Sequence, residues 1–503
     1  MLHRLLKLIL TSRVYEAAVE TPLEESQALS NELGNRVLLK REDLQPIFSF
    51  KLRGAYNKIA QLDATNRQAG VIAASAGNHA QGVAFSAQRL GIPATIVMPV
   101  TTPDIKVEAV KHFGAEVILF GDSYSEAAEH CLRLVAASGK TFVHPFDDEL
   151  VIAGQGTVGD EIIRQCPGRL DAIFVPVGGG GLIAGIAAYI KEIRPEIKIF
   201  GVEPRDSAAM AQSLVAGHRV QLDSVGIFAD GVAVREVGEL TFAICRDHVD
   251  AIIQVDTDEI CSGIKAVYQA TRSIVEPAGA LALAGLKKHV RDTGLSGATL
   301  VAINSGANMN FERLRYVAER TQVGEKQEAL FAVKIPERPG SLRQFCSQII
   351  GQRNITEFNY RLADRSSAQI FVGIAMRGDQ ERKRFSQDLA TAGIDNVDLT
   401  DNELAKTHIR YMVGGRSEAA AGERLYRFWF PERPGALTRF LDAMGKSWNI
   451  SLFHYRLQGG DYGRVLVGLE IPLEDQHAVP EILDRLGYRY IEETANPAYQ
   501  LFL

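Results

Sequence analysis

The stretch Ile173-Phe-Val-Pro-Val-Gly-Gly-Gly-Gly-Leu182-Ile-Ala-Gly-Ile186 decides the fold class of this 503-residue chain. A short apolar run, typical of a buried strand, leads into four consecutive glycines and then into an Ala/Ile-rich helical pattern. Consecutive glycine N–H groups at a helix start form a cradle for a phosphate. The dinucleotide-binding motif needs GxGxxG and the phosphate-loop motif ends in Gly-Lys-Ser/Thr, whereas Leu182 follows the glycines here. Because adjacent glycines are costly to fold, a functional role is favoured over a purely structural one.

The same order of strand, turn and helix recurs on both sides of this stretch, from about Val37 to Gly306. Several predicted strands are followed by Gly, Pro or Ser and then a helical pattern; the strands are Val71–Ala74, Ala94–Met98, Val117–Phe120, Ile173–Val177, Ile199–Val202 and Leu300–Ile303. This repetition predicts an α/β domain with a mostly parallel sheet. Ligands of such sheets bind at the carboxyl ends of the strands, where the loops lie.

A lysine lies upstream, in Phe48-Ser-Phe-Lys-Leu-Arg-Gly54. Lys51 could form a Schiff base, since packing beside Phe50 would desolvate the amine and lower its pKa. On its own this motif is weak evidence, because most lysines are solvated surface residues.

Two strand-ending turns carry further candidates. In Ala73-Ala-Ser-Ala-Gly-Asn-His-Ala-Gln-Gly82, Ser75 is a candidate helix cap, and Gly77 lets the turn expose backbone N–H groups that could bind a carboxylate. Asn78 adds a side-chain amide, and His79 could act as a base, although histidine beside a cap usually only donates or accepts a hydrogen bond. In Ile303-Asn-Ser-Gly-Ala-Asn308, Ser305 could offer its hydroxyl to a heteroaromatic nitrogen. The first turn alone fits an ordinary connection equally well, and the second alone would be interpreted as an ordinary strand-ending turn.

Together these motifs supply an activatable lysine, a carboxylate cradle, a phosphate cradle and a strand-ending hydroxyl. Pyridoxal-phosphate catalysis on an amino acid requires this combination, since the cofactor is the electron sink and the protein positions it. The combination therefore indicates a pyridoxal-phosphate enzyme.

The composition is that of an ordinary globular protein, with 46% hydrophobic and 23% charged residues. A net charge of −6 gives no electrostatic footprint for nucleic acid, and no run reaches the roughly 18 apolar residues that span a membrane. Five scattered cysteines without CxxC spacing favour reduced thiols and a cytoplasmic location over disulfides or zinc. At the N-terminus, Leu2, Leu5, Leu6 and Ile9 share one helix face, which predicts an amphipathic packing helix rather than an export signal.

The pattern changes after Glu319, where a duplication begins. Three blocks recur at one offset of 95 residues (Gly340 to Gly435), which makes chance matching improbable; they are Leu330–Gly340 with Tyr426–Gly435, Asn354–Arg361 with Asn449–Arg456, and Ile370–Gly373 with Val465–Gly468. Each copy reads as strand, Pro-Gly turn, helix, two strands and a second helix.

The second helices are predicted at Glu381–Ala392 and Gln476–Leu486, and Ser417–Gly422 is the predicted linker. This order is a βαββαβ-like unit, whose sheet has one face free to pack on its twin. A duplicated unit without a nucleophile or base is best interpreted as a ligand-binding module, with oligomerisation alone as the alternative.

The motifs at Ser49–Ala55, Ser75–Gly82, Gly178–Leu182 and Ser305–Asn308 resemble those of biosynthetic threonine ammonia-lyase (threonine dehydratase or deaminase), a fold type II pyridoxal-phosphate enzyme. The resemblance covers nearly the whole chain. It implies a tryptophan-synthase-β-like catalytic domain over residues 1–322 and two ACT-like regulatory repeats over residues 328–402 and 423–497.

The resemblance also implies a role for each motif residue. Lys51 carries the Schiff base and removes the α-proton of L-threonine, and Phe50 lies against the cofactor. Asn78 holds the ring hydroxyl oxygen and Ser305 the pyridine nitrogen. The phosphate is held by Gly178, Gly179, Gly180, Gly181 and Leu182. The substrate carboxylate is held by Ser75, Ala76, Gly77, Asn78 and His79.

Further expectations concern products, control and metal. The resemblance implies release of 2-oxobutanoate and ammonia at the start of isoleucine biosynthesis. It also implies a homotetramer that is inhibited by isoleucine, with valine opposing that inhibition. Tyr360 and Tyr455, at equivalent positions of the two copies, would line the effector pockets. Some relatives bind a divalent ion through a Glu and an Asp six residues later, but Ala209 stands at that spacing from Glu203, so no metal is expected.

Two alternatives remain open at this point. One is a sibling enzyme, such as a serine dehydratase or a cysteine or threonine synthase, against which the duplicated tail argues. The other is an inactive amino-acid sensor, against which the intact Lys51 and glycine cradle argue.

Overall fold

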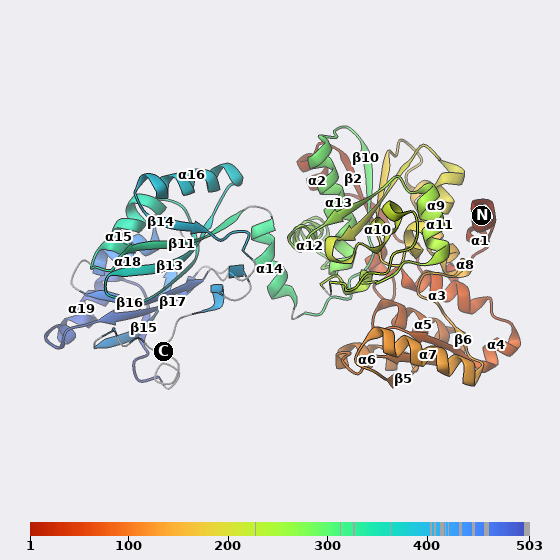
Figure 1. The fold of residues 1–503 in the computed structure, drawn as a ribbon, viewed down its shortest axis with the longest axis horizontal. Coiled ribbons are helices and arrows are strands. Elements are labelled where there is room, and N and C mark those ends of the chain that lie inside the picture. Colours follow the sequence, from red (N-terminus) through yellow and green to blue (C-terminus); the bar gives the residue numbers. More distant parts are fainter. Residues whose placement is uncertain are drawn as a thin grey trace. The chain divides into compact units, whose positions relative to one another are not determined.

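The computed structural model describes the chain except for residues 227, 312, 325–326, 363, 403–404, 407–408, 413–416, 418, 421, 432–434, 445–447, 457–461 and 497–503. It consists of two compact units, Met1–Thr321 and Gln322–Leu503, and the boundary falls within helix α14 (Arg313–Gly324) (Figure 1). Among the described residues, no helix is long and apolar enough to cross a membrane.

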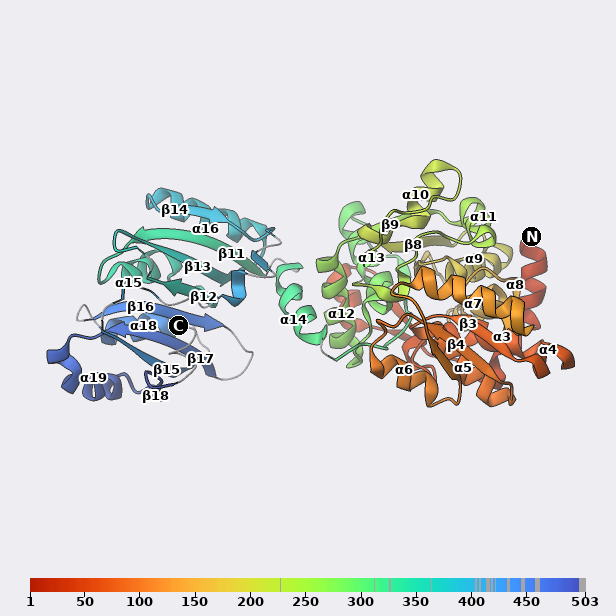
Figure 2. The ribbon, with the colours of Figure 1, turned by 60° about the horizontal axis from the view of Figure 1, so that its bottom comes forward.

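The first unit contains two sheets, drawn with their helices in Figure 2. All neighbouring strands pair in parallel except β1 with β2. The larger sheet has the order β1 (Leu23–Glu25), β2 (Arg36–Arg41), β10 (Thr299–Asn304), β7 (Ala172–Pro176), β8 (Lys198–Pro204) and β9 (Ala251–Val255). The smaller has the order β5 (Glu116–Leu119), β4 (Ala94–Met98), β3 (Val71–Ala74) and β6 (Thr141–Phe142).

Helices cover both faces of the larger sheet, so its central strands β10 and β7 are buried runs without polar alternation. One face packs against α1 (Leu2–Leu10), α8 (Glu149–Gln165), α9 (Gly181–Ile193), α10 (Ala209–Ala216) and α11 (Glu239–His248). The other face packs against α2 (Gln27–Leu33), α12 (Thr257–Thr271) and α13 (Pro277–Thr293).

The smaller sheet is also covered on both faces. Helices α3 (Lys51–Ala60), α5 (Asn78–Leu90) and α6 (Asp104–Lys111) lie on one face and α7 (Tyr124–Ser138) on the other. Short helical turns and α4 complete the unit: η1 (Val14–Glu16), η2 (Glu42–Leu44), α4 (Ala64–Ala69), η3 (Arg205–Ser207) and η4 (Asp230–Val232).

The six strands that the sequence predicts are all present, with ends displaced by at most two residues. The N-terminal amphipathic helix is confirmed as α1, whose Leu5 and Ile9 are buried. The mostly parallel α/β arrangement is confirmed, and its strands divide between two sheets, because β3, β4 and β5 form a sheet of their own with β6. Apolar patterning identifies a strand but does not specify its partner, and β6 is too short to give a pattern.

The second unit is built from two βαββαβ copies, as predicted. The first copy comprises β11 (Glu328–Pro336), α15 (Ser341–Phe345) with η5 (Cys346–Ile350), β12 (Ile355–Arg361), β13 (Ser367–Ala375), α16 (Asp379–Thr391) and β14 (Asp395–Asp398). After η6 (Ile409–Tyr411), the second comprises β15 (Glu423–Pro431), α18 (Ala436–Met444), β16 (Asn449–Arg456), β17 (Tyr462–Glu470), η7 (Leu473–Ala478), α19 (Val479–Leu486) and β18 (Tyr490–Glu492).

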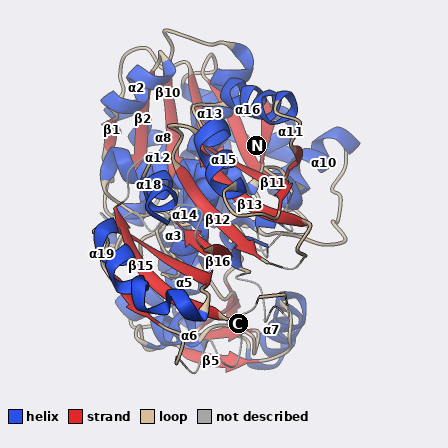
Figure 3. Cartoon of the chain, turned by 90° about the vertical axis from the view of Figure 1, so that its left-hand side faces the viewer, coloured by secondary structure: helices blue, strands red, loops and turns tan. Residues whose placement is uncertain are grey.

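The expected packing of one copy's sheet face on the other is wrong. Strands β12 and β16 pair antiparallel, from Glu357 opposite Arg456 to Arg361 opposite Leu452, and join the copies into one eight-stranded sheet. Edge pairing satisfies N–H and C=O groups that face packing would leave exposed. Helices α15, α16, α18 and α19 share one face of this sheet (Figure 3). The predicted linker lies partly outside the described residues, as does residue 497 of the predicted second repeat.

Candidate active site and regulatory pockets

The four glycines form a tight, side-chain-free turn between β7 and α9. Gly180 has a φ of +94°, and a β-carbon on any of the four would lie 2.2–3.0 Å from a neighbouring atom. The first N–H groups of α9, at Gly181, Leu182 and Ile183, have no carbonyl partner within the helix. Backbone donors and the positive end of the helix dipole are therefore available to an anion at this turn.

Lys51 is the first residue of α3. Its Nζ donates to the carbonyl oxygen of Pro145 at 2.9 Å and lies 5.4 Å from the centroid of the Phe50 ring. Burial disfavours the ammonium form and lowers the pKa of Lys51 to about 8, against an opposing effect of the Glu276 carboxylate. A reactive neutral amine is thus accessible near neutral pH.

The loop of residues 144–148 connects Lys51 with the glycine turn. The ring of Phe146 packs against Gly179, where a β-carbon would approach it to 2.2 Å. The Asp147 carboxylate accepts N–H groups at the start of α11, from Glu239 (2.9 Å), Leu240 (2.9 Å) and Thr241 (3.2 Å). The hydroxyl of Thr241 in turn donates to the Gly179 carbonyl oxygen at 2.6 Å.

The remaining motifs meet at the end of β10. The backbone N–H of Phe50 donates to the Ser305 carbonyl oxygen at 3.2 Å, so the lysine loop adjoins this strand end. The Ser305 hydroxyl is buried and donates to the Ala278 carbonyl oxygen at a long distance of 3.3 Å. Asn308 Nδ2 donates to Asn78 Oδ1 at 2.7 Å, which links this turn to α5. Motifs far apart in sequence therefore lie together.

The turn before α5 differs in detail from the prediction. The residue that caps α5 is Gly77, not Ser75; the Ser75 hydroxyl accepts the Gly77 N–H at 3.2 Å, one step outside the helix. Gly77 has no neighbour within 4 Å of a β-carbon, and Ala76 lies beside it in the turn. The buried His79 ring bonds through Nε2 to the Val143 carbonyl oxygen at 2.8 Å, and burial lowers its pKa to about 3. This low pKa keeps the His79 ring neutral. Because a carbonyl oxygen only accepts, the single ring proton is on Nε2.

Sequence reasoning missed two parts of this site. The 144–148 loop follows a two-residue strand that gives no pattern. Glu276 accepts a hydrogen bond from Asn78 Nδ2 at 2.6 Å and was also missed. A signal for Glu276 was present, since Pro277 at the first position of α13 marks a helix start.

Two family models match the chain. "Pyridoxal-phosphate dependent enzyme" matches residues 14–306, and "C-terminal regulatory domain of Threonine dehydratase" matches residues 319–409 and 414–503. The "L-threonine dehydratase biosynthetic IlvA" of Burkholderia multivorans is 58% identical over 100% of this chain and 99% of its own length. The chain belongs to the biosynthetic threonine dehydratase family. The Escherichia coli protein of the same name is 52% identical over 99% of this chain and 96% of its own length.

A solved relative agrees with this assignment. The processed form of threonine deaminase isoform 2 from Solanum lycopersicum superposes with a TM-score of 0.63 at 50% identity, over 64% of this chain and 88% of that one. The fold type II catalytic unit and the paired regulatory repeats are thus those of the family.

Pyridoxal 5′-phosphate is the cofactor of this family, and the residues present fit it. The glycine turn leaves no room for β-carbons yet presents main-chain donors, as a phosphate requires. Lys51 supplies an amine of lowered pKa beside that turn. The described residues include no group of three or more His, Cys, Asp or Glu side chains that could hold a metal ion, and the Glu203 carboxylate accepts the N–H groups of Met210 and Ala211.

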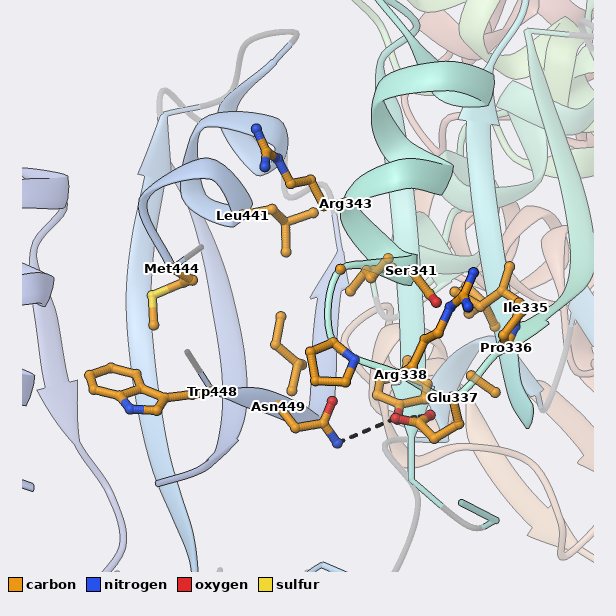
Figure 4. A pocket seen from close by; sticks show the side chains of 17 residues that line it. Ile335, Pro336, Glu337, Arg338, Ser341, Arg343, Leu441, Met444, Trp448 and Asn449 are labelled. Atoms are coloured by element: carbon orange, nitrogen blue, oxygen red, sulfur yellow. Dashed lines mark hydrogen bonds between the residues drawn. The ribbon is translucent and has the colours of Figure 1, made fainter. Parts of the chain in front are cut away.

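In the described part of the regulatory unit, two pockets each span about 520 Å³ of space, part of which is open to solvent. The first is lined by the turn after β11, by Tyr360 and by the end of α18 with the start of β16 (Figure 4). Tyr360 donates its hydroxyl to Glu337 Oε2 at 2.5 Å, and Asn449 Nδ2 approaches Glu337 Oε1 at 3.3 Å. Among the residues that the structure describes, the buried hydroxyl of Ser341 has no hydrogen-bond partner.

The second pocket repeats the first with the two copies exchanged. It is lined by Phe430 of β15, by residues 435–438 at the start of α18, by Tyr455 and by the end of η5 with the start of β12. The walls nonetheless differ, because Trp448 and Leu441 of the first pocket correspond, 95 residues earlier, to Arg353 and Cys346 of the second. Each pocket therefore needs both copies, and the two are chemically distinct.

Proposed function

We propose that this chain removes water and ammonia from L-threonine to give 2-oxobutanoate, at the start of isoleucine biosynthesis, under inhibition by isoleucine. The catalytic part of this proposal is supported by the lowered pKa of the Lys51 amine, which lies beside a turn of main-chain N–H groups suited to a phosphate. Relatives named biosynthetic threonine dehydratase match almost the full length of the chain and support the choice of substrate.

Each part of the site has a role in this proposal. Gly178, Gly179, Gly180, Gly181 and Leu182 would hold the cofactor phosphate, Asn78 the ring oxygen, Ser305 the ring nitrogen, and Phe50 one side of the ring. When bound, the cofactor supplies an electron sink for the carbon that loses its proton. Lys51 would bind the cofactor as a Schiff base and, once released, take the α-proton at Nζ.

The start of α5 would hold the substrate carboxylate. Its first N–H groups, at Asn78, His79 and Ala80, have no carbonyl partner within the helix, and the helix dipole favours an anion there. His79 would contribute its backbone N–H only, because its ring is neutral and committed to Val143. Lys51 is then the base of the site.

We assign the effector function to the two pockets of the regulatory unit. A free amino acid needs a carboxylate for its ammonium group and apolar walls for its side chain. The first pocket offers Glu337, oriented by Tyr360, together with Leu441, Met444 and Trp448. Isoleucine would bind here, and the second pocket around Tyr455 would serve an amino acid of similar size, with valine opposing the inhibition.

Assembly and location rest on the family resemblance, which supports a homotetramer in the cytoplasm. Light scattering of the purified protein measures the first directly, and a mass of one or two chains would contradict it.

The substrate assignment is tested by measuring 2-oxoacid formation from L-threonine and L-serine in parallel. The proposal expects a higher kcat/KM for threonine. A preference for serine would instead support the alternative of a serine dehydratase.

A further inference from the structure

Glu276 is a buried carboxyl group placed where a helix cap would stand. It directly precedes α13, yet its side chain makes no capping hydrogen bond to that helix, and it is only 7% exposed. Burying a carboxyl group without hydrogen-bond partners costs free energy. Because Glu276 does not cap α13, we expect its carboxyl group to have a specific partner elsewhere.

That partner is Asn78. Glu276 Oε1 accepts a hydrogen bond from Asn78 Nδ2 at 2.6 Å, while Asn78 Oδ1 accepts one from Asn308 Nδ2 at 2.7 Å. The Asn78 amide is therefore held at both ends, which fixes its orientation. An amide NH₂ group has two N–H bonds, so one remains for another acceptor.

The backbone around Glu276 leaves room for its carboxyl group. A β-carbon on Gly306 would lie 2.5 Å from Glu276 Oε1, and one on Gly231 would lie 3.6 Å from it. The Glu276 N–H donates to the Gly306 carbonyl oxygen at 3.1 Å, next to Ser305. Glu276 is thus tied to the same strand end as the other site residues.

Charged groups from several elements face Glu276: Lys51 on α3, Lys106 on α6, Asp230 on η4 and Arg313 on α14. Burial first, and then the Asp230 carboxylate, raise the pKa of Glu276 to about 7. Whether protonated or ionised, the carboxyl group keeps an oxygen that can accept from Asn78.

We propose that Glu276 is a positioning residue of the cofactor site, which holds the Asn78 amide so that its second N–H faces the oxygen on the cofactor ring. The proposal rests on the proposed function for the role of Asn78. It adds a residue that acts on the cofactor through Asn78 and whose position is not explained by capping of α13.

A double-mutant cycle on cofactor affinity tests this directly. Pyridoxal phosphate is titrated into cofactor-free Asn78→Ala, Glu276→Ala and the double variant, and binding is followed by absorbance, without substrate. Each single change should weaken binding about tenfold, and the double change also about tenfold, because Glu276 acts through Asn78. Losses that multiply to about a hundredfold would overturn the proposal.

A conservative variant separates positioning from general stability. Glu276→Gln keeps an oxygen for the Asn78 amide and should bind the cofactor within about twofold of wild type. If it binds as weakly as Glu276→Ala, the proposal is also overturned. Should Glu276→Ala not fold, Glu276→Met takes its place, since it fills the space but offers no oxygen.

Glu259→Gln is the matched control. Glu259 is a capping-box residue of α12 that accepts the Asp256 N–H and pairs with Lys288, with no contact to Asn78 among the hydrogen bonds described. Its cofactor affinity should be unchanged; a loss equal to that of Glu276→Ala would show a general effect. Because these readouts need no turnover, failure of the threonine reaction would leave them interpretable.

Discussion

At the scale of the residue, the surroundings of Lys51 set its reactivity. The amine contacts the Pro145 carbonyl oxygen and the Phe50 ring, and burial lowers its pKa to about 8 from an ordinary 10.5. Because burial disfavours the ammonium form, the neutral amine appears at lower pH than on an exposed lysine.

This gives a prediction for the cofactor-free protein. Labelling of Lys51 by a lysine-selective acylating reagent, followed by peptide mapping over pH 6–11, should rise with a midpoint near pH 8. In urea the midpoint should move up toward that of an ordinary lysine. A midpoint near 10.5 in the folded protein would contradict the assigned environment.

A second residue-scale prediction concerns the glycine turn. Gly180→Asp places a β-carbon 2.8 Å from Met210 Cε, at a φ of +94°, and a negative charge among the phosphate donors. Cofactor affinity, measured by spectroscopic titration, should fall at least a hundredfold.

The matched control is Gly91→Ala. Gly91 also has a positive φ, +66°, but no neighbour lies within 4 Å of a β-carbon and it ends α5. This change should lower stability by about 1 kcal/mol and leave cofactor affinity unchanged. Unchanged cofactor affinity in Gly180→Asp would show that the phosphate does not bind at this turn.

Most residues proposed for the site could be named from sequence, because glycine runs and strand-ending turns are local patterns. The roles of Glu276 and Asp147 could not be predicted, since they depend on partners about 200 and 90 residues away (Asn78 at 198 and Glu239 at 92); Pro277 marks the start of α13 but not the partner of Glu276. For His79, the sequence offered a role as a base, and only the hydrogen bond of its ring to the Val143 carbonyl oxygen argues against that role.

At the scale of the element, periodicity predicted strands well and their arrangement poorly. Strands β3, β4 and β7 are fully buried runs that the sequence marks clearly. Their division between two sheets, and the edge pairing of β12 with β16, depend on contacts distant in sequence. The βαββαβ order was predictable because duplication displays it twice.

The turn that joins β11 to α15 contains Glu337, which accepts the hydroxyl of Tyr360 on β12, and this contact gives a prediction for isoleucine inhibition. Tyr360→Phe removes the hydroxyl that holds Glu337 but keeps the ring, which is part of the core. We expect the isoleucine concentration for half-inhibition to rise about tenfold, within the 1–3 kcal/mol typical of allosteric coupling, with unchanged turnover on threonine alone.

Tyr490→Phe is the control for this change. Its hydroxyl also donates to a carboxylate, Asp484 at 3.3 Å, but it lines neither pocket. Isoleucine inhibition should be unaltered there. If Tyr360→Phe responds to isoleucine as wild type does, the first pocket is not the effector site.

At the scale of the whole molecule, one chain combines a pyridoxal-phosphate catalytic unit with a regulatory unit in which two pockets lie between the repeats. Neither part alone distinguishes a regulated threonine dehydratase from a related lyase or a sensor. The property that would distinguish them, under the function proposed above, is a change of catalysis in the first unit when the second unit binds an amino acid.

The most direct test is the rate of 2-oxobutanoate formation from L-threonine by the full-length, cofactor-loaded protein over a range of isoleucine concentrations. We expect turnover that isoleucine suppresses, and none above background from a folded Lys51→Ala variant. Near wild-type product formation by Lys51→Ala, or a wild-type rate that isoleucine leaves unchanged, would contradict this account.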